Sequence, residues 1–174
     1  NTDCFAFFHE ETLQAKFIRL WEALATRYGH RSDIITFELL NEVTAREVAE
    51  DWNRISKKTI EAIRKIAPDI RIMVGGIFNS SIYGLTLMEA PYDENIVFTF
   101  HCYNPLVYTH QSAYWIPTMP KGYTCSYPLS HRDMFERSHK IFGSDFDSEF
   151  EQDSDALLDA DYFKKMFAPA LAVA

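Results

Sequence analysis

Two groups of polar residues follow apolar, β-branched runs and could carry acid–base chemistry. Asn41 and Glu42 come directly after the run over residues 34–40, and His101 and Tyr103 close a later run. A buried parallel strand has a continuous apolar sequence, and the carboxyl ends of such strands carry the chemistry of α/β barrels. A carboxylate, an amide, an imidazole and a phenol can together move protons and bind hydroxyl groups. The sequence therefore predicts a catalytic site made of these four residues.

Each group also has a purely structural interpretation. Asn41 could cap the following helix, with the negative charge of Glu42 stabilised in its first turn. A lone histidine on a strand is more often a satisfied core residue. The two-residue period of a strand places His101 and Tyr103 on one face, together with Thr99. Because such groups recur at corresponding ends of two strands, we favour a site over these alternatives.

A third group, over residues 108–115, combines aromatic rings with hydrogen-bonding side chains. His110, Tyr114 and Trp115 lie in this segment. A sugar ring can stack its C–H face on an aromatic ring while its hydroxyls bind neighbouring polar groups. The alternative is a loop that packs on its own rings. The segment predicts a binding surface for a neutral, polyhydroxylated ligand, with these three residues as substrate-binding residues.

Composition and charge limit the classes of partner. The chain has 174 residues, of which 47% are hydrophobic, so we expect one globular domain with a sizeable core. Its net charge of -8 argues against nucleic acid and anionic membrane as partners. No apolar run is long enough for a transmembrane helix. The sequence begins at Asn1 without a signal-peptide pattern, which predicts a processed product or a fragment and leaves localisation open.

Cysteines and metal-binding side chains give weaker signals. The chain has three cysteines, too few for a disulfide scaffold. Cys102 lies in an apolar run and is expected to be a buried thiol, whereas pairing of Cys4 with Cys125 stays open.

A possible metal site involves His131, Asp133 and His139, which lie near several acidic residues. They lack the compact spacing of a ligand motif. We therefore predict no catalytic metal and no other cofactor, and leave open a structural ion such as calcium in the acidic loop.

The elements that must position these groups alternate between helices and strands. Apolar periodicity predicts helices over residues 11–28 and 51–66, a helical turn within 80–89, and strands over 34–40, 70–77 and 95–103. This alternation predicts an α/β fold of parallel strands with helical crossovers. Residues 104–153 show little periodicity and predict a long functional loop, followed by a helix over 154–174.

The motifs Leu-Leu-Asn-Glu, His-Cys-Tyr-Asn-Pro and Tyr-Thr-His-Gln-Ser-Ala-Tyr-Trp occur in this order. Together they resemble glycoside hydrolase family 5, the cellulase-like retaining β-glycosidases. The resemblance covers nearly the whole chain and implies the central part of a (β/α)8 TIM barrel. Residues 1–174 would then form a single partial-barrel catalytic domain with an insertion loop at about 104–153.

The same resemblance implies roles for the site residues. Glu42 matches the general acid/base, and Asn41 matches the residue that binds the sugar 2-hydroxyl. His101 and Tyr103 match the active-site histidine and tyrosine, and the tyrosine normally binds the nucleophile. The implied substrate is a β-1,4-linked plant polysaccharide or oligosaccharide, most simply a glucan. Glucanases, mannanases and xylanases share these motifs, so the sequence leaves the polysaccharide open.

Several parts of the family pattern have no counterpart, namely the nucleophile, an upstream Arg and His, and a downstream Trp. The family's nucleophile is a second Glu in a Gly-Glu-Phe/Tyr-Gly setting, and no such segment occurs in this sequence. A retaining glycosidase needs two carboxyls only about 5–5.5 Å apart. Glu149 is the superficial candidate, with a solvated acidic loop as the alternative. The sequence thus predicts an endo-β-1,4-glucanase or mannanase-like chain cut before its nucleophile, and leaves the activity of the chain alone open.

Two other functions remain compatible with the sequence. The chain could be a non-catalytic glycan-binding or inactive remnant module that holds glycans through Trp115, Tyr114 and His101. It could also be an unrelated barrel enzyme with a chance Asn-Glu pair. A second carboxylate close to Glu42 would separate catalysis from binding. An incomplete barrel leaves sheet edges unpaired, so we also predict self-association.

Overall fold

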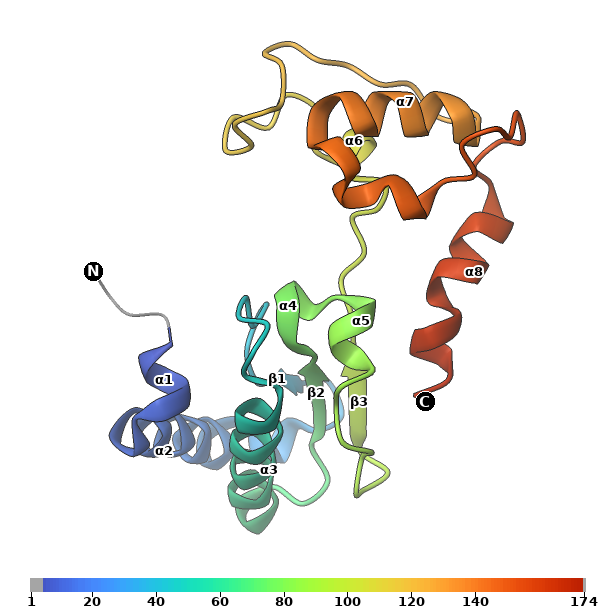
Figure 1. The fold of residues 1–174 in the computed structure, drawn as a ribbon. Coiled ribbons are helices and arrows are strands. Elements are labelled where there is room, and N and C mark those ends of the chain that lie inside the picture. Colours follow the sequence, from blue (N-terminus) through green and yellow to red (C-terminus); the bar gives the residue numbers. More distant parts are fainter. Residues whose placement is uncertain (1–4, 174) are drawn as a thin grey trace. The chain divides into compact units, whose positions relative to one another are not determined.

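The computed structural model describes residues 5–173, which divide into two compact units. The first unit is formed by the chain up to His101 and from Pro169 onward, and the second by Cys102–Ala168. The elements of the first unit can be followed in Figure 1: α1 (Ala6–His9), α2 (Glu11–Tyr28), η1 (Gly29–Arg31), β1 (Thr36–Glu38), α3 (Ala49–Ile66), β2 (Arg71–Gly75), α4 (Ile77–Ser80), α5 (Ile82–Leu85) and β3 (Ile96–Thr99).

The strands of the first unit form a parallel sheet in the order β1-β2-β3. Phe37 of β1 lies opposite Ile72 of β2, and Val74 of β2 lies opposite Phe98 of β3. Helix α3 connects the first two strands. The turn α4, which has a left-handed backbone at Phe78 and Asn79, and the short helix α5 lie between the last two strands. The prediction of parallel strands with helical crossovers is confirmed.

The strands are shorter than the apolar runs that predicted them. Strand β1 has three residues, and Ile34, at the start of its run, is 68% exposed. Strand β3 ends at Thr99, so His101 and Tyr103 lie beyond the ladder. The expectation that these two residues share a strand face was therefore wrong. The apolar run that contains β1 extends past this strand at its other end, because Leu39 and Leu40 still pack in the core.

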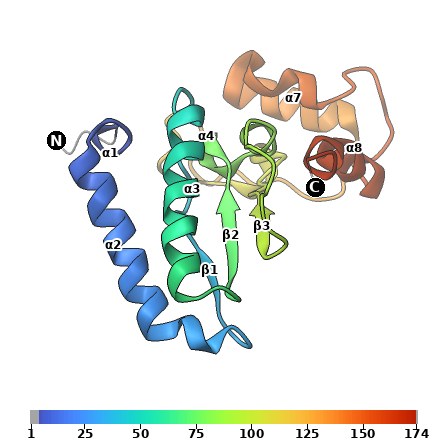
Figure 2. The ribbon, with the colours of Figure 1, turned by 90° about the horizontal axis from the view of Figure 1, so that it is seen from below.

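Helices α2 and α3 lie side by side and pack on the sheet (Figure 2). Helix α2 has the predicted bounds and ends before Gly29, whereas α3 begins two residues earlier than predicted. The ring of Trp21 contacts that of Phe37 at 5.2 Å between centroids. Trp52 is fully buried, and its indole N–H donates to the carbonyl of Gly75 at 2.8 Å, which satisfies its polar atom. No helix among residues 5–173 is long and apolar enough to cross a membrane.

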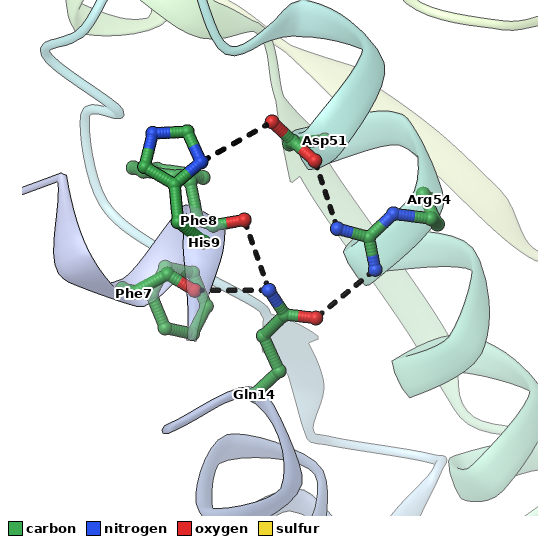
Figure 3. Close-up of polar contacts among 6 residues, drawn as sticks. All are labelled: Phe7, Phe8, His9, Gln14, Asp51 and Arg54. Carbon is green, nitrogen blue, oxygen red and sulfur yellow. Dashed lines mark hydrogen bonds and ion pairs between the residues drawn. The ribbon is translucent and has the colours of Figure 1, made fainter. Parts of the chain in front are cut away.

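A buried amide joins α1, α2 and α3 (Figure 3). The Gln14 side chain donates to the carbonyls of Phe7 and Phe8 at 3.2 and 3.0 Å. Its oxygen accepts a hydrogen bond from Arg54 at 3.0 Å, and Arg54 also donates to Asp51 at 2.8 Å. Because both ends of the Gln14 amide are paired, its burial carries little desolvation cost.

The second unit has its own core around Val107, Met134 and Leu158, all fully buried. Its elements are α6 (Leu106–Thr109), α7 (His131–Phe142), η2 (Gly143–Glu149) and most of α8 (Ala160–Leu171). Residues 104–153 were expected to lack regular structure, so helix α7 corrects that expectation. Whether the two units act as one catalytic domain over 1–174 stays a prediction.

The cysteines differ in part from expectation. Cys102 lies outside the strands and is only partly buried, although burial still raises the pKa of its thiol. Cys102 and Cys125 are free thiols in the described part of the chain. The question of a bond between Cys4 and Cys125 falls on Cys4, which lies outside the described residues.

Candidate active site

Two of the predicted catalytic residues are in direct contact. Nδ1 of His101 and Oε1 of Glu42 are 2.7 Å apart, although the residues are 59 positions apart in the sequence. Both side chains are partly buried, at 25% and 29% exposed. The distance is that of a strong hydrogen bond to a carboxylate. The imidazole therefore fixes the orientation of the Glu42 carboxyl at the ends of β1 and β3.

Glu42 also has an unusual backbone conformation. Its φ is 46°, in the left-handed region that residues other than glycine rarely adopt. Such a conformation costs about 1–3 kcal/mol and is found most often where function requires it. Leu39 and Val43, on either side, are both buried. These two apolar anchors hold the loop after β1 so that Glu42 is turned out of the core.

Asn41 lies beside Glu42 in the same loop and is exposed. It does not cap the next helix, because α3 begins at Ala49 and its N-cap residue is Val48. The capping interpretation of the Asn41–Glu42 pair was therefore wrong, and the pair sits in a loop of irregular structure.

The predicted substrate-binding residues form a chain of rings in the second unit. The ring of Tyr103 contacts that of His110 at 5.4 Å, His110 contacts Trp115 at 6.2 Å, and Trp115 contacts Tyr114 at 5.0 Å. The rings meet edge to face, which is a favourable aromatic geometry. Trp115 is nevertheless 62% exposed and Tyr114 92% exposed. The segment thus packs on its own rings and still presents aromatic surface to solvent.

Glu149 does not lie in a solvated loop. It ends η2, and its Oε1 accepts a hydrogen bond from the side-chain amide of Asn104. Burial raises the pKa of its carboxyl to about 7, although Asn104 and the nearby Tyr162 hydroxyl act in the opposite direction. The solvated interpretation of this side chain was wrong. Its role as a nucleophile stays a prediction.

A cavity of about 550 Å³ lies beside Glu149 in the second unit. Its wall includes Tyr162, His131, Glu151 and Lys165. The buried Oε2 of Glu149 and the buried Tyr162 hydroxyl have no well-aligned hydrogen bond among the described residues. Sequence reasoning missed this environment, because the residues come from segments with no common motif.

The histidines and aspartate of the possible metal site are dispersed. His139 contacts Asp147 at 3.0 Å, and the Nδ1 of His131 accepts a hydrogen bond from the backbone N–H of Glu151 at 3.2 Å. Within residues 5–173, no group of three or more His, Cys, Asp or Glu side chains is arranged to hold a metal ion.

Comparison with known proteins gives a consistent result. Residues 7–164 match the family model described as "Cellulase (glycosyl hydrolase family 5)". The chain is 46% identical over 116 residues to cellodextrinase A of Ruminococcus flavefaciens, across 67% of this chain and 34% of that protein. It is 36% identical over 130 residues to endoglucanase C of Acetivibrio thermocellus, across 74% of this chain and 38% of that protein. The chain thus spans little more than a third of these relatives.

Solved structures show the same similarity. Cel5A of Thermotoga maritima, in complexes with cellobiose and with mannotriose, matches with a TM-score of 0.62 and 27% sequence identity. The match covers 78% of this chain and 45% of Cel5A. The parallel strands and their helical crossovers are therefore part of a (β/α)8 TIM barrel, as predicted.

Proposed function

Because the chain belongs to glycosyl hydrolase family 5, we propose that it forms part of a retaining endo-β-1,4-glucanase. The observation that carries the proposal is the 2.7 Å contact between Glu42 and His101. It places an oriented carboxyl at the carboxyl ends of two barrel strands, where α/β barrels carry their chemistry.

In this proposal Glu42 is the general acid/base. It protonates the glycosidic oxygen as the bond breaks and then takes a proton from the water that hydrolyses the glycosyl-enzyme. His101 positions the carboxyl for both steps. Asn41, next to Glu42, binds the sugar 2-hydroxyl, and Tyr103 acts with the nucleophile.

The proposed substrate is a β-1,4-glucan or a related mannan. Trp115, Tyr114 and His110 supply exposed rings and a hydrogen-bonding edge, which suit the C–H faces and hydroxyls of a sugar. Relatives are named cellodextrinase and endoglucanase, and Cel5A was solved with cellobiose and with mannotriose.

The retaining mechanism also needs a second carboxylate as nucleophile. No Gly-Glu-Phe/Tyr-Gly segment occurs in the 174 residues. We therefore infer that the nucleophile is supplied by a segment outside this sequence, with Glu149 as the candidate inside it. If neither reaches Glu42, the chain holds half a site.

The test measures the release of reducing sugar from two substrates, carboxymethyl cellulose and a β-mannan. The chain is compared with Glu42→Gln and with Glu47→Gln, a control for an exposed carboxyl in the same loop. Activity lost only in Glu42→Gln supports the acid/base role and a complete site. Measurable and equal activity in Glu42→Gln and wild type overturns that role, whereas no activity in either protein means that the chain holds half a site.

A glycan-binding module is the second candidate function, favoured by the exposure of Trp115 and Tyr114. It predicts binding of cello-oligosaccharides without any product. Calorimetric titration of the same three proteins with cellohexaose distinguishes it from hydrolysis. If wild type and Glu42→Gln both bind cellohexaose and neither releases sugar, this chain alone binds glycans and does not catalyse their hydrolysis.

A further inference from the structure

The turn after β2 has a backbone conformation that its sequence does not favour. Phe78, Asn79 and Ser80 have φ values of 53°, 57° and 53°. Residues with a side chain normally visit the left-handed region singly, and of these three types only Asn tolerates it well. Three such residues in succession persist only where surrounding contacts hold them.

The turn makes backbone hydrogen bonds to the loop that carries Glu42. The N–H of Asn79 donates to the carbonyl of Val43 at 2.8 Å, and the N–H of Phe78 donates to the carbonyl of Ala45 at 3.3 Å. Both acceptors lie within three residues of Glu42. The left-handed backbone is what turns these two donors towards that loop.

The same turn also holds His101. The carbonyl of Ser80 accepts a hydrogen bond from the backbone N–H of His101 at 2.8 Å. The two residues of the proposed acid–base pair are thus each tied, through the backbone, to one three-residue segment. A shift of that segment would change the distance between their side chains.

Side chains and small residues fix the turn in place. The guanidinium of Arg46 lies 3.7 Å above the centre of the Phe78 ring, a cation–π contact that joins the turn to the Glu42 loop. Ser80 is buried, and a methyl group at Gly75 would collide with its hydroxyl. Gly84 of α5 faces the carbonyl of Ile77 so closely that no side chain fits there. Asn79, in contrast, is exposed.

We propose that the turn Phe78–Asn79–Ser80 is a positioning element that sets the contact between Glu42 and His101. It acts through the backbone and touches no substrate. The proposal rests on the proposed function, because it explains how the geometry of the acid–base pair is maintained.

The test uses position 79, where an exposed side chain can be changed without altering the core. Preference for the left-handed region falls from Gly and Asn through Ala to Val. The series Asn79→Gly, Asn79→Ala and Asn79→Val therefore varies one backbone preference. Two readouts follow His101 by NMR: exchange of its backbone amide hydrogen, and the resonance of the ring proton shared with Glu42.

We expect Asn79→Gly to keep both signals and Asn79→Val to lose the ring-proton resonance. His101 amide exchange should become about tenfold faster in Asn79→Val, the factor that corresponds to one strained residue. Phe78→Ala removes the contact with Arg46 and should change both His101 signals by an intermediate amount. This variant replaces Asn79→Val in the test if Asn79→Val does not fold.

Ser112→Val is the matched control. Ser112 is an exposed residue with a φ of 58° in the second unit, so the same strain is introduced elsewhere. It should leave both His101 signals unchanged. A folded Asn79→Val protein with wild-type His101 signals would overturn the proposal. Because neither readout needs turnover, an inactive wild-type chain that follows the expected series would show that this chain alone does not hydrolyse glycans and would retain the positioning role.

Discussion

Asn104 donates a hydrogen bond from its side-chain amide to Glu149, 45 residues later in the sequence. Asn104 directly follows Tyr103, the first ring of the aromatic chain in the second unit. The partly buried carboxyl at the end of η2 thus anchors the segment that leads into the proposed binding surface. The anchor contains an ionisable group, so its strength should depend on pH.

The first prediction concerns the pH dependence of stability at Glu149. Burial raises the pKa of this carboxyl from its ordinary value of 4.5 to about 7, so the folded protein binds the proton more tightly than the unfolded chain. The stability gained from this tighter proton binding is fully present below about pH 4.5 and is lost as the pH rises through 7. After discounting for partial exposure, we expect a loss of about 2 kcal/mol between pH 5 and pH 8.

Glu149→Gln should remove this pH dependence, because a neutral amide keeps the bond from Asn104 without a charge to desolvate. Urea unfolding at pH 5, 6, 7 and 8 gives the free energy of unfolding of both proteins. The pH dependence due to Glu149 is the difference between wild type and variant. Glu151→Gln, at an exposed neighbouring carboxyl, should follow wild type. Parallel curves for wild type and Glu149→Gln would contradict the prediction.

The second prediction concerns the ion pair between α3 and the segment before β3. Arg64 donates two hydrogen bonds to Asp93, at 2.8 and 3.0 Å, and a third to the carbonyl of Ile70 at 2.6 Å. The hydrogen bonds from Arg64 hold the pKa of Asp93 below its usual range. The stabilisation is therefore present above the ordinary pKa of an aspartate and is lost as the pH falls through the lowered value.

Asp93→Asn should reduce the free energy of unfolding by about 1 kcal/mol at pH 7, a value discounted for the partial exposure of Asp93. The difference should shrink at acidic pH. Asp161→Asn, which removes an exposed pair with Lys164, should have no measurable effect. Thermal unfolding of the three proteins at pH 7 and pH 3 checks both statements, and a pH-independent difference would argue against an electrostatic origin.

The third prediction concerns glycan binding by the exposed rings. Trp115→Ala should weaken binding of cellohexaose by about tenfold, because one stacking surface of about 1 kcal/mol or slightly more is lost. Isothermal titration gives the affinity. Tyr83→Ala removes an equally exposed ring from α5 in the first unit and should leave affinity unchanged. Equal losses in both variants would show that the effect is not specific to the proposed surface.

The fourth prediction concerns self-association. β1 and β3 are the outer strands of the sheet, and Val97 on β3 is partly exposed. Open edges with apolar side chains pair with other chains. The apparent mass by light scattering should therefore rise with concentration, and Val97→Lys should reduce that rise. Leu20→Lys, on the exposed side of α2, is the control. A wild-type chain that stays monomeric at every concentration would refute this prediction.

Several elements could be predicted from the sequence because local signals agreed with packing. Helix α2 has a long apolar stripe and a glycine directly after Tyr28, so both of its ends were predicted. Helix α7 was missed because the polar residues around it hid a shorter apolar stripe. Its signal was available: the hydroxyl of Ser130 accepts a hydrogen bond from the N–H of Asp133, an N-cap that Ser-x-x-Asp indicates.

The sequence could predict that Glu42 and His101 lie near each other, but it could not predict the geometry of their contact. Parallel strands bring their carboxyl ends together, so Glu42 and His101 could be expected near each other. The left-handed backbone at Glu42 could not be predicted, because the position carries no glycine and the loop is bonded to a turn far away in the sequence. The Gly75–Gly76 pair signalled a close backbone approach at β2, but nothing in the sequence indicated what approaches.

The close approach of Gly84 to Ile77 has a consequence for comparing homologous sequences. A hydrogen atom is the largest group that fits at this position, so any other residue requires a different path of the main chain after β2. Glycine at this position therefore serves as a diagnostic marker. Homologues that carry it can share the backbone described above, whereas homologues that lack it must build this corner of the barrel in another way.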